Sequence, residues 1–326
     1  MNLPSFEDVA AARARLSGRV VRTPMLRHPL LDEITGARVL LKPEPLQRTG
    51  SFKLRGATNA LLKFTEAERR AGVVTHSSGN HGQATAAAAA AIGARATVFM
   101  PADAPRIKVE STARWGAEII HYDRTADDRE ALARDFAART GAVFVAPFDH
   151  PDVIAGQGTL ALELVEDAAA AGLALDAMLV NTGGGGLIAG CALALEGVSP
   201  ATRVFSVEPA GWDDTARSLA AGDRVANPPG GSTLCDSLLS KQPGEITFAV
   251  NRPRLAGGLA VSDAEVLAAI RFAFDHLKLV VEPGGAVCLA ALLAGRFDAR
   301  GQVVGAVISG GNVDPAVFAR ALATRH

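Results

Sequence analysis

Lys53 is the residue whose type and setting first suggest covalent chemistry. It lies in Gly50–Gly56 (GSFKLRG), where Ser51 has the character of a helix N-cap and would place Phe52 and Lys53 in the first turn of a helix running to about Phe64. The helix dipole disfavours a cation at that end, so it would lower the pKa of Lys53 and suit an amine that must lose its proton to form an imine. An arbitrary lysine is more often a solvated surface residue, so this hypothesis depends on the other motifs.

A second motif, Ser77–Gly82 (SSGNHG), follows the strand-like Val73–Thr75 and opens an alanine-rich stretch. Small residues and free amide groups at the start of a helix form an anion pocket that suits a carboxylate. Asn80 can also hydrogen-bond a phenolic oxygen. A simple capped turn explains the local sequence equally well, and in that case His81 packs or caps.

Four consecutive glycines occur in Thr182–Gly190 (TGGGGLIAG), directly after the apolar Ala177–Asn181. Because glycine has no Cβ atom, successive amides can point inward and cradle a phosphate at the start of a helix. The segment is not a P-loop, because no Gly-Lys-Ser/Thr sequence follows it. We therefore predict a phosphate-binding loop here.

The same glycines also fit a different function. Gly184, Gly186 and Ala189 satisfy a dinucleotide fingerprint, and Glu208 follows about twenty residues later, where a ribose-binding acid would lie. A dinucleotide-binding oxidoreductase is therefore an alternative, but it leaves GSFKLRG and SSGNHG without a role.

A fourth motif, Ile308–Val313 (ISGGNV), ends the last apolar run of the chain. It would place Ser309 at the carboxyl end of a strand, and Gly310 and Gly311 would permit close backbone approach. A plain turn is the alternative on local grounds.

The elements that must position these motifs alternate between short apolar runs and alanine-rich helical stretches. This alternation predicts an α/β fold with parallel sheets and helices on both faces, in which ligands bind at the carboxyl ends of the strands. The expected strands are Ala96–Met100, Glu118–Tyr122, Ala142–Ala146, Ala177–Asn181, Arg203–Val207 and Val303–Ser309. The expected helices include Gly82–Ile92, Ala126–Arg139, Ala155–Ala171, Asp263–Leu277 and Ala316–Thr324.

Composition excludes several other classes of protein. The 326 residues are 48% hydrophobic and 21% charged with a net charge of −1, which gives no reason to expect a nucleic acid or a membrane as partner. Three widely spaced cysteines without a CxxC motif favour buried, unreactive thiols over disulfides or a metal site. No signal segment or long apolar run is evident, so a cytoplasmic location is expected.

Together and in this order, the motifs resemble the fold-type II pyridoxal-phosphate (PLP) enzymes, which are tryptophan synthase β-like. Within them the likeness is to the serine/threonine dehydratase (threonine ammonia-lyase) and serine racemase branch. It covers nearly the whole chain through QRTGSFKLRGATNAL, THSSGNHGQA, VIAGQGT, NTGGGGLIAG, VEPGGAV and ISGGNVD. It implies a homodimer whose subunits have a large PLP-binding domain (residues 1–73 and 148–326) and a small mobile domain (74–147).

The resemblance also implies roles for individual residues. Lys53 would hold the cofactor, pyridoxal 5'-phosphate, and remove the α-proton, and Ser78 would be a second acid/base on the opposite face. Ser309 would face the pyridine nitrogen and leave it largely unprotonated, which favours elimination over transamination. The implied cofactor contacts are Phe52, Lys53, Asn80, Gly183, Gly184, Gly185, Gly186, Leu187 and Ser309, and the substrate contacts are Ser77, Ser78, Asn80, His81, Arg129 and Ser240.

A divalent-cation site follows from the resemblance as well. Glu208 and Asp214 in VEPAGWDD match its carboxylates, and the carbonyl of Trp212 would be a third ligand. Oxygen ligands of this kind suit Mg²⁺, Ca²⁺ or Mn²⁺. Solvated acidic residues at a strand end are the alternative.

The expected activity is an ammonia-lyase (dehydratase) that converts L-threonine or L-serine to a 2-oxo acid and ammonia. A 3-hydroxyaspartate dehydratase or a serine racemase is the alternative on the same scaffold, and a β-replacement synthase is a further one. Arg129 and Ser240 match positions that contact a ligand's second carboxylate in the racemase branch, although the neighbouring acidic residues also fit an ordinary charged helix start. The sequence departs from the branch in VEPGGA and in CDSL (Cys235–Leu238), so threonine and serine are not assumed.

Overall fold

The computed structural model describes residues 2–77, 79–104 and 106–324, and within this range the strands form two sheets. The larger sheet has the strand order β1-β9-β6-β7-β8 and the smaller sheet the order β4-β3-β2-β5. Neighbouring strands in both sheets run parallel, which confirms the predicted α/β class. The strands are β1 (Arg38–Pro43), β2 (Val73–His76), β3 (Ala96–Pro101), β4 (Glu118–Tyr122), β5 (Val143–Phe144), β6 (Ala177–Asn181), β7 (Arg203–Pro209), β8 (Leu255–Val261) and β9 (Val303–Ile308).

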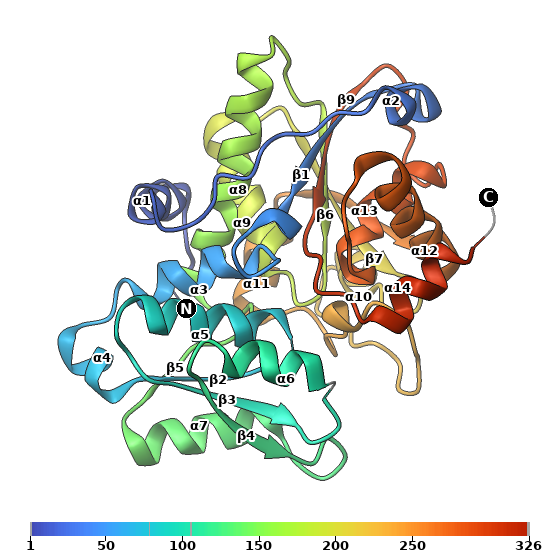
Figure 1. Ribbon diagram of the computed structural model, residues 1–326. Coiled ribbons are helices and arrows are strands. Elements are labelled where there is room, and N and C mark those ends of the chain that lie inside the picture. Colours follow the sequence, from blue (N-terminus) through green and yellow to red (C-terminus); the bar gives the residue numbers. More distant parts are fainter. Residues whose placement is uncertain (1, 78, 105, 325–326) are drawn as a thin grey trace.

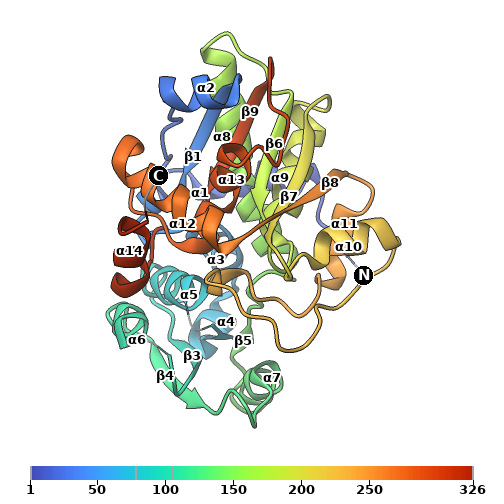
Figure 2. The ribbon, with the colours of Figure 1, turned by 90° about the vertical axis from the view of Figure 1, so that its right-hand side faces the viewer.

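Helices cover both faces of each sheet (Figures 1 and 2). The α-helices are α1 (Phe6–Leu16), α2 (Pro29–Thr35), α3 (Lys53–Leu61), α4 (Glu66–Ala71), α5 (Asn80–Ala91), α6 (Arg106–Ala113), α7 (Arg129–Thr140), α8 (Pro151–Ala170), α9 (Gly186–Val198), α10 (Asp214–Ala221), α11 (Glu245–Asn251), α12 (Asp263–Phe272), α13 (Pro283–Leu293) and α14 (Pro315–Leu322). Short helical turns are η1 (Glu44–Leu46), η2 (Asp236–Leu238) and the π-helical η3 (Ala273–Leu277). None of the described helices is long and apolar enough to span a lipid bilayer.

The larger sheet separates two hydrophobic cores. One core packs α12 and α13 against one face of the sheet, and the other packs α8 and α9 against the opposite face. Strand β1 pairs with β9 along its whole length, from Arg38 beside Val303 to Pro43 beside Ile308. An early segment and a late segment of the chain therefore lie side by side in the sheet, and the motifs that follow these two strands end at the same edge.

The smaller sheet is built from consecutive elements. In Figure 1, α5 and α6 cover one face of β2, β3 and β4, and α7 covers the other. Helix α5 is rich in alanine, and most of its residues are buried. Small side chains let this helix approach the strands closely, and the start of the helix is thereby fixed at the carboxyl end of β2.

The predicted elements are largely confirmed, with differences at their ends. The strands expected at Glu118–Tyr122 and Ala177–Asn181 have the predicted bounds, whereas Ala142–Ala146 is reduced to β5, whose two residues pair with β2. Helix α7 begins only at Arg129, because the carboxylate of Asp128 accepts the amides of the first turn and caps the helix there.

One further predicted element needs correction, and one strand was missed. The helix predicted over Asp263–Leu277 is α-helical only to Phe272 and continues as the π-helical η3. Strand β8 was not predicted, because Gly257 and Gly258 in its centre resemble a turn in the sequence. Cys191, Cys235 and Cys288 are buried and not in disulfides, as expected.

Candidate active site

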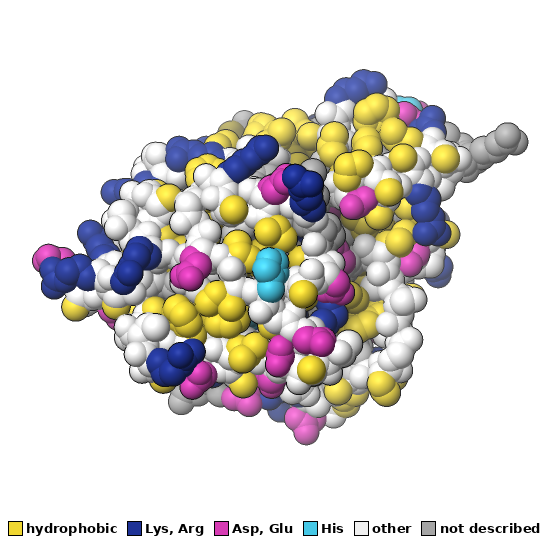
Figure 3. Space-filling view, turned by 60° about the horizontal axis from the view of Figure 1, so that its bottom comes forward, with side chains coloured by type: hydrophobic (Ala, Val, Ile, Leu, Met, Phe, Trp, Pro, Cys, Tyr) yellow, Lys and Arg dark blue, Asp and Glu magenta, His cyan; other side chains and the backbone are white. Residues whose placement is uncertain are grey.

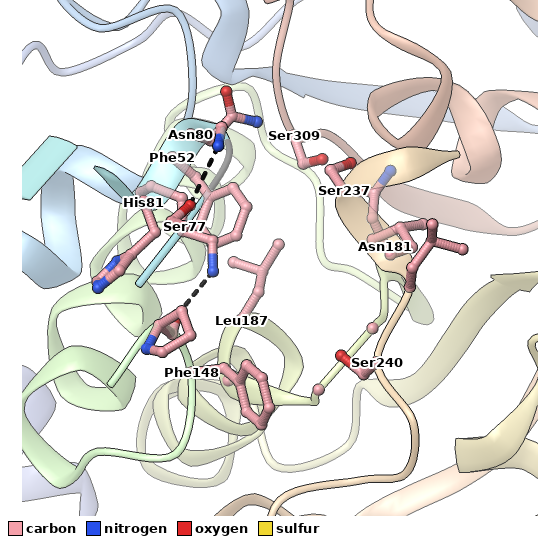
Figure 4. A pocket seen from close by; sticks show the side chains of 18 of the residues that line it. Phe52, Ser77, Asn80, His81, Phe148, Asn181, Leu187, Ser237, Ser240 and Ser309 are labelled. Carbon is pink, nitrogen blue, oxygen red and sulfur yellow. Dashed lines mark hydrogen bonds between the residues drawn. The ribbon is translucent and has the colours of Figure 1, made fainter. Parts of the chain in front are cut away.

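One pocket brings together the predicted motifs, which lie far apart in the sequence. The predicted cofactor and substrate residues that line it are Phe52, Lys53, Ser77, Asn80, His81, Arg129, Gly183, Gly184, Gly185, Gly186, Leu187, Ser240 and Ser309. In Figure 4, Phe52, Ser77 and His81 lie on one side of the pocket, Asn181, Ser237 and Ser309 on the other, and Leu187 and Phe148 between them. Ser78 lies outside the described residues, so its predicted role stays a prediction.

Lys53 begins helix α3, and its amine lies inside this pocket. Its Nζ donates to the carbonyl of Pro147 at 2.7 Å and lies 5.2 Å from the centre of the Phe52 ring. Burial lowers the pKa of Lys53 to about 8, against the opposing charge of Glu282. A lowered pKa was expected here, but the cause is mainly desolvation rather than the helix dipole alone. At neutral pH a useful fraction of this amine is therefore unprotonated.

The predicted N-cap of this helix is wrong. Phe52, not Ser51, occupies the capping position, and Ser51 forms an antiparallel bridge with Gly310. The amide of Phe52 donates to the carbonyl of Ser309 at 3.1 Å. The strand-like pairing replaces a side-chain cap, and it fixes the segment that carries Lys53 to the segment that carries Ser309.

The glycine segment Thr182–Gly190 joins strand β6 to helix α9 at the base of the pocket. Gly185 has a φ of 91°, a left-handed conformation that side chains disfavour. A Cβ atom on Gly184 would lie 2.4 Å from the ring of Phe148, so a larger residue does not fit. Among the described residues, the amides of Gly184, Gly185 and Gly186 donate to no protein acceptor. These amides at the start of α9 can bind a phosphate group.

The side-chain amide of Asn80 is held by two neighbours. Its Nδ2 donates to Oε1 of Glu282 at 2.6 Å, and its Oδ1 accepts from Nδ2 of Asn312 at 2.7 Å. This pair of contacts fixes which end of the amide carries the hydrogens. One N–H of Asn80 therefore remains to bind an acceptor in the pocket.

Glu282 is a buried carboxyl group that the sequence analysis did not single out. It is the N-cap residue of α13, it is 3% exposed, and it lines the pocket. Burial raises its pKa to about 7, and the nearby charge of Asp236 adds to this effect. The motif VEPGGAV contains this residue, but its apolar surroundings in the sequence gave no sign that the carboxyl group faces a pocket.

His81 and His76 are both buried near the pocket but differ in their contacts. The Nε2 atom of His81 lies 3.3 Å from the carbonyl of Val145, and the predicted contact of His81 with the substrate stays a prediction. His76 has no hydrogen-bond partner at either ring nitrogen among the described residues, although it stacks on Phe144. Burial, and then the charge of Arg129, lower the pKa of His76 to about 4. His76 is therefore a neutral ring with two unused polar atoms at the pocket wall.

Charged groups from both sheets meet around the same pocket. Arg129 lines it as an exposed side chain, and the described residues give its guanidinium no hydrogen-bond or ion-pair partner. Lys108 of α6 forms an ion pair with Asp236 of η2, so this contact joins elements on opposite sides of the pocket. The face shown in Figure 3 intersperses acidic and basic side chains. The guanidinium of Arg129 can therefore bind the carboxylate of a ligand in this pocket.

Behind helix α3, on the side away from the pocket, lies a cluster of buried charges. Arg55 is fully buried and bonds Glu44 and Glu163 with both sides of its guanidinium at 2.8–2.9 Å. Lys42 bonds Glu163 at 2.7 Å. Burial opposes the charge of Arg55, but these carboxylates raise its pKa above the ordinary value. We call Lys42, Glu44, Arg55 and Glu163 the buried ion cluster. It connects β1, η1, α3 and α8.

The predicted metal residues lie close together, Glu208 near the end of strand β7 and Asp214 at the start of α10. Burial raises the pKa of Glu208 to about 8, with a further contribution from Asp214, and burial also raises that of Asp214 to about 6. Both oxygens of Glu208 accept backbone amides of α10 at 2.9 Å, whereas Oδ2 of Asp214 has no partner among the described residues. The described residues contain no group of three or more acidic, histidine or cysteine side chains suited to a metal ion.

Comparisons with known proteins identify the family of this chain. The model of the family described as "Pyridoxal-phosphate dependent enzyme" matches residues 16–310. The chain is 45% identical to the L-threo-3-hydroxyaspartate ammonia-lyase of a Pseudomonas species over 99% of both chains. It is 41% identical to the serine racemase of Schizosaccharomyces pombe, over 96% of this chain and 95% of that one. The solved structure of maize serine racemase superposes with a TM-score of 0.92 at 35% identity, over 98% of this chain and 97% of that chain.

Proposed function

This chain belongs to the pyridoxal-phosphate dependent enzyme family, and we propose that within it the protein is an ammonia-lyase of small 3-hydroxy amino acids that prefers L-threo-3-hydroxyaspartate. The products would be a 2-oxo acid and ammonia. The observation that carries the substrate choice is the pair of Arg129, which has no partner among the described residues, and His76, whose ring nitrogens are unused, in the pocket that contains Lys53. A guanidinium and a neutral imidazole suit the second carboxylate that hydroxyaspartate has and threonine lacks.

The pocket also fits the family's cofactor. The unpaired amides of Gly184 and Gly185 suit its phosphate, and the amine of Lys53, with a pKa of about 8, suits covalent attachment. The remaining N–H of Asn80 suits the ring oxygen, while Gly183, Gly186, Leu187, Phe52 and Ser309 complete the cradle. When bound, PLP supplies an electron sink for the charge left by the departing α-proton.

The chain's own groups would then perform the proton transfers and the positioning. The amine of Lys53 would be the base that removes the α-proton of the substrate. Ser77, Asn80 and the start of α5 would bind the α-carboxylate, and Ser240 would assist Arg129 at the second one. Ser309 lines the pocket and would face the pyridine nitrogen, where a serine, unlike an acidic residue, would favour elimination.

The test compares two substrates and three proteins. We expect wild type to have a higher kcat/KM for L-threo-3-hydroxyaspartate than for L-threonine, measured as 2-oxo acid formed. Arg129→Met should lower this value for hydroxyaspartate by about 10- to 100-fold, since a hydrogen bond between charged groups contributes about 1.5–3 kcal/mol. It should change the value for L-threonine less than about threefold, because threonine has no second carboxylate.

The matched control is Arg139→Met, which removes an exposed arginine paired with Asp135 at the other end of α7. It should leave both substrates unaffected. Equal losses for the two substrates in Arg129→Met, or a wild type that prefers threonine, would contradict the proposed substrate.

Serine racemisation is a second candidate activity, because a serine racemase is similar over nearly the whole chain. It depends on Ser78, which would protonate the opposite face of the substrate. Formation of D-serine from L-serine in wild type, and its loss in Ser78→Ala, would support it.

We further propose a divalent cation, Mg²⁺ before Ca²⁺ or Mn²⁺, at Glu208, Asp214 and the carbonyl of Trp212. The unpartnered Oδ2 of Asp214, buried beside the carboxyl group of Glu208, supports a cation at this position. Because both oxygens of Glu208 already accept amides, water molecules would have to complete the coordination.

The domain and assembly predictions remain proposals. We infer that residues 74–147 form a small domain that closes on the substrate. We also propose a homodimer, in which exposed apolar side chains such as Leu46, Phe274 and Val280 would be covered. A cytoplasmic location stays a prediction.

A further inference from the structure

The outer side of the glycine loop is bonded to a short helix, α11, that no sequence motif singled out. The hydroxyl of Thr247 donates to the carbonyl of Gly184 at 2.7 Å, and the amide of Gly244 donates to the same oxygen at 3.2 Å. One turn later, Nδ2 of Asn251 donates to the carbonyl of Gly185 at 3.3 Å, which also accepts the amide of Ala189 at 3.0 Å in the first turn of α9. Two consecutive carbonyls of the loop are therefore held by α11 and the residue before it.

Holding a carbonyl also directs an amide. Each peptide unit is planar and trans, so its C=O and N–H groups point in opposite directions. A Gly184 carbonyl turned toward α11 turns the amide of Gly185 away from α11, and the Gly185 carbonyl does the same for the amide of Gly186. These two amides have no protein acceptor among the described residues, and both glycines line the pocket.

The contacts of Thr247 and Asn251 with the glycine loop are closely packed and fixed by the surrounding fold. Thr247 is fully buried and Asn251 is 1% exposed. A Cβ atom on Gly185 would lie 3.0 Å from both Asn251 Nδ2 and Thr247 Oγ1, so the two polar groups rest directly on the loop backbone. Helix α11 is itself fixed by Asp149, whose carboxylate accepts the amides of Glu245 and Thr247 at 3.0 Å.

We propose that Thr247 and Asn251 are positioning residues, which hold the carbonyls of Gly184 and Gly185 so that the loop amides face the phosphate of the cofactor. This inference rests on the proposed function, because it assumes that the loop binds that phosphate. The two side chains act through the loop and do not touch the ligand. Their contribution is preorganisation: the loop is ordered before the phosphate arrives, so binding does not have to order it.

The proposal predicts a loss that depends on the phosphate. Thr247→Val keeps the side-chain volume but removes the hydroxyl, so the loop must be ordered when the ligand binds. We expect the Kd of the apoprotein for PLP to rise about tenfold, because the buried carbonyl of Gly184 loses the hydrogen bond from Thr247. Pyridoxal, which has the same ring and aldehyde but no phosphate, should bind with a Kd changed less than about twofold.

The experiment measures the Kd of both ligands by absorbance titration of the apoprotein, in wild type and three variants. Thr247→Ser keeps the hydroxyl and should keep the wild-type preference for PLP. Thr202→Val is the matched control, because Thr202 is also a buried threonine whose hydroxyl donates to a carbonyl, that of Leu175 at 2.9 Å. It should leave both affinities unchanged. If Thr247→Val does not fold, Thr247→Ala provides the same comparison, because it also removes the hydroxyl that holds the carbonyl of Gly184.

The outcomes separate this inference from the proposed function. A wild type that binds pyridoxal as tightly as PLP would overturn the phosphate site itself. A wild type that prefers PLP, with the same preference kept in Thr247→Val, would overturn the positioning role alone. Equal weakening of both ligands in Thr247→Val would assign the residue a general structural role and would also overturn it.

Discussion

The buried ion cluster offers a sharp test of what holds the Lys53 helix in place. Arg55 lies two residues after Lys53 on α3, and its guanidinium bonds Glu44 and Glu163 with no exposure to solvent. Replacing it by methionine removes the charge but keeps much of the length of the side chain. Lys42 is then left to face two buried carboxylates, so the cluster carries an uncompensated negative charge.

The magnitude follows from this burial. Breaking a buried ion pair by removing one partner costs about 3–5 kcal/mol, because the remaining charge keeps its desolvation cost. A folded domain is stable by only about 5–15 kcal/mol, so Arg55→Met should lose a large part of the free energy of unfolding. Arg22→Met is the control. Arg22 pairs with Glu166 and Asp167, which lie on α8 as Glu163 does. Its side chain is 47% exposed, so the expected cost is about 0–1 kcal/mol.

The assay is urea unfolding of the apoprotein, followed by circular dichroism, for wild type and both variants. A third variant, Arg55→Met with Glu163→Gln, restores the charge balance and should recover about 1–3 kcal/mol. The reasoning is refuted if Arg55→Met costs no more than Arg22→Met. Glu163→Gln alone completes the cycle, and the reasoning is also refuted if the double variant is less stable by the sum of the losses in the two single variants.

Two further predictions concern the pocket and the proposed metal site. Attachment of PLP needs a neutral amine, and the pKa of Lys53 is lowered to about 8. The rate of PLP incorporation into the apoprotein should therefore rise with pH from 6 and level off above about 8. Stopped-flow absorbance would measure this rate, and a rate independent of pH in this range would contradict the prediction. Millimolar Mg²⁺ should raise the Tm of wild type, because a ligand that binds the folded state stabilises it, but it should not raise the Tm of Glu208→Gln. Calorimetry with Mg²⁺ and with a chelator measures both values. The same shift in both proteins would exclude the site.

The sequence could predict those parts of the site that depend on local chain geometry. A strand, four glycines and a helix make an anion-binding loop wherever they occur in this order, and the structure has β6, the loop and α9 as expected. The same holds for Lys53 at the start of a helix and for Ser309 directly after β9. Their meeting in one pocket followed from the strand ends of a parallel sheet.

The residues that the sequence could not reveal are those whose partners are distant in the chain. Glu282 contacts Asn80 across 202 positions, and Thr247 reaches Gly184 across 63. No local pattern marks either residue, because an acid before proline and a threonine in a helix occur everywhere. The wrong N-cap at Ser51 has the same origin: its partner, Gly310, is supplied by the last strand rather than by the helix that follows.

That bridge between Ser51 and Gly310 has a consequence for how the protein is made. The segment bearing Lys53 leaves the ribosome early, but β9, the strand that pairs with β1 and fixes this segment, is synthesised about 250 residues later. Until then β1 lacks the neighbour that joins it to β6, and Ser309, which lines the pocket, is missing from it. Contacts this remote in sequence form slowly, because the chain must first close a long loop. A nascent chain therefore cannot capture the cofactor early, and incorporation belongs to the last stage of folding.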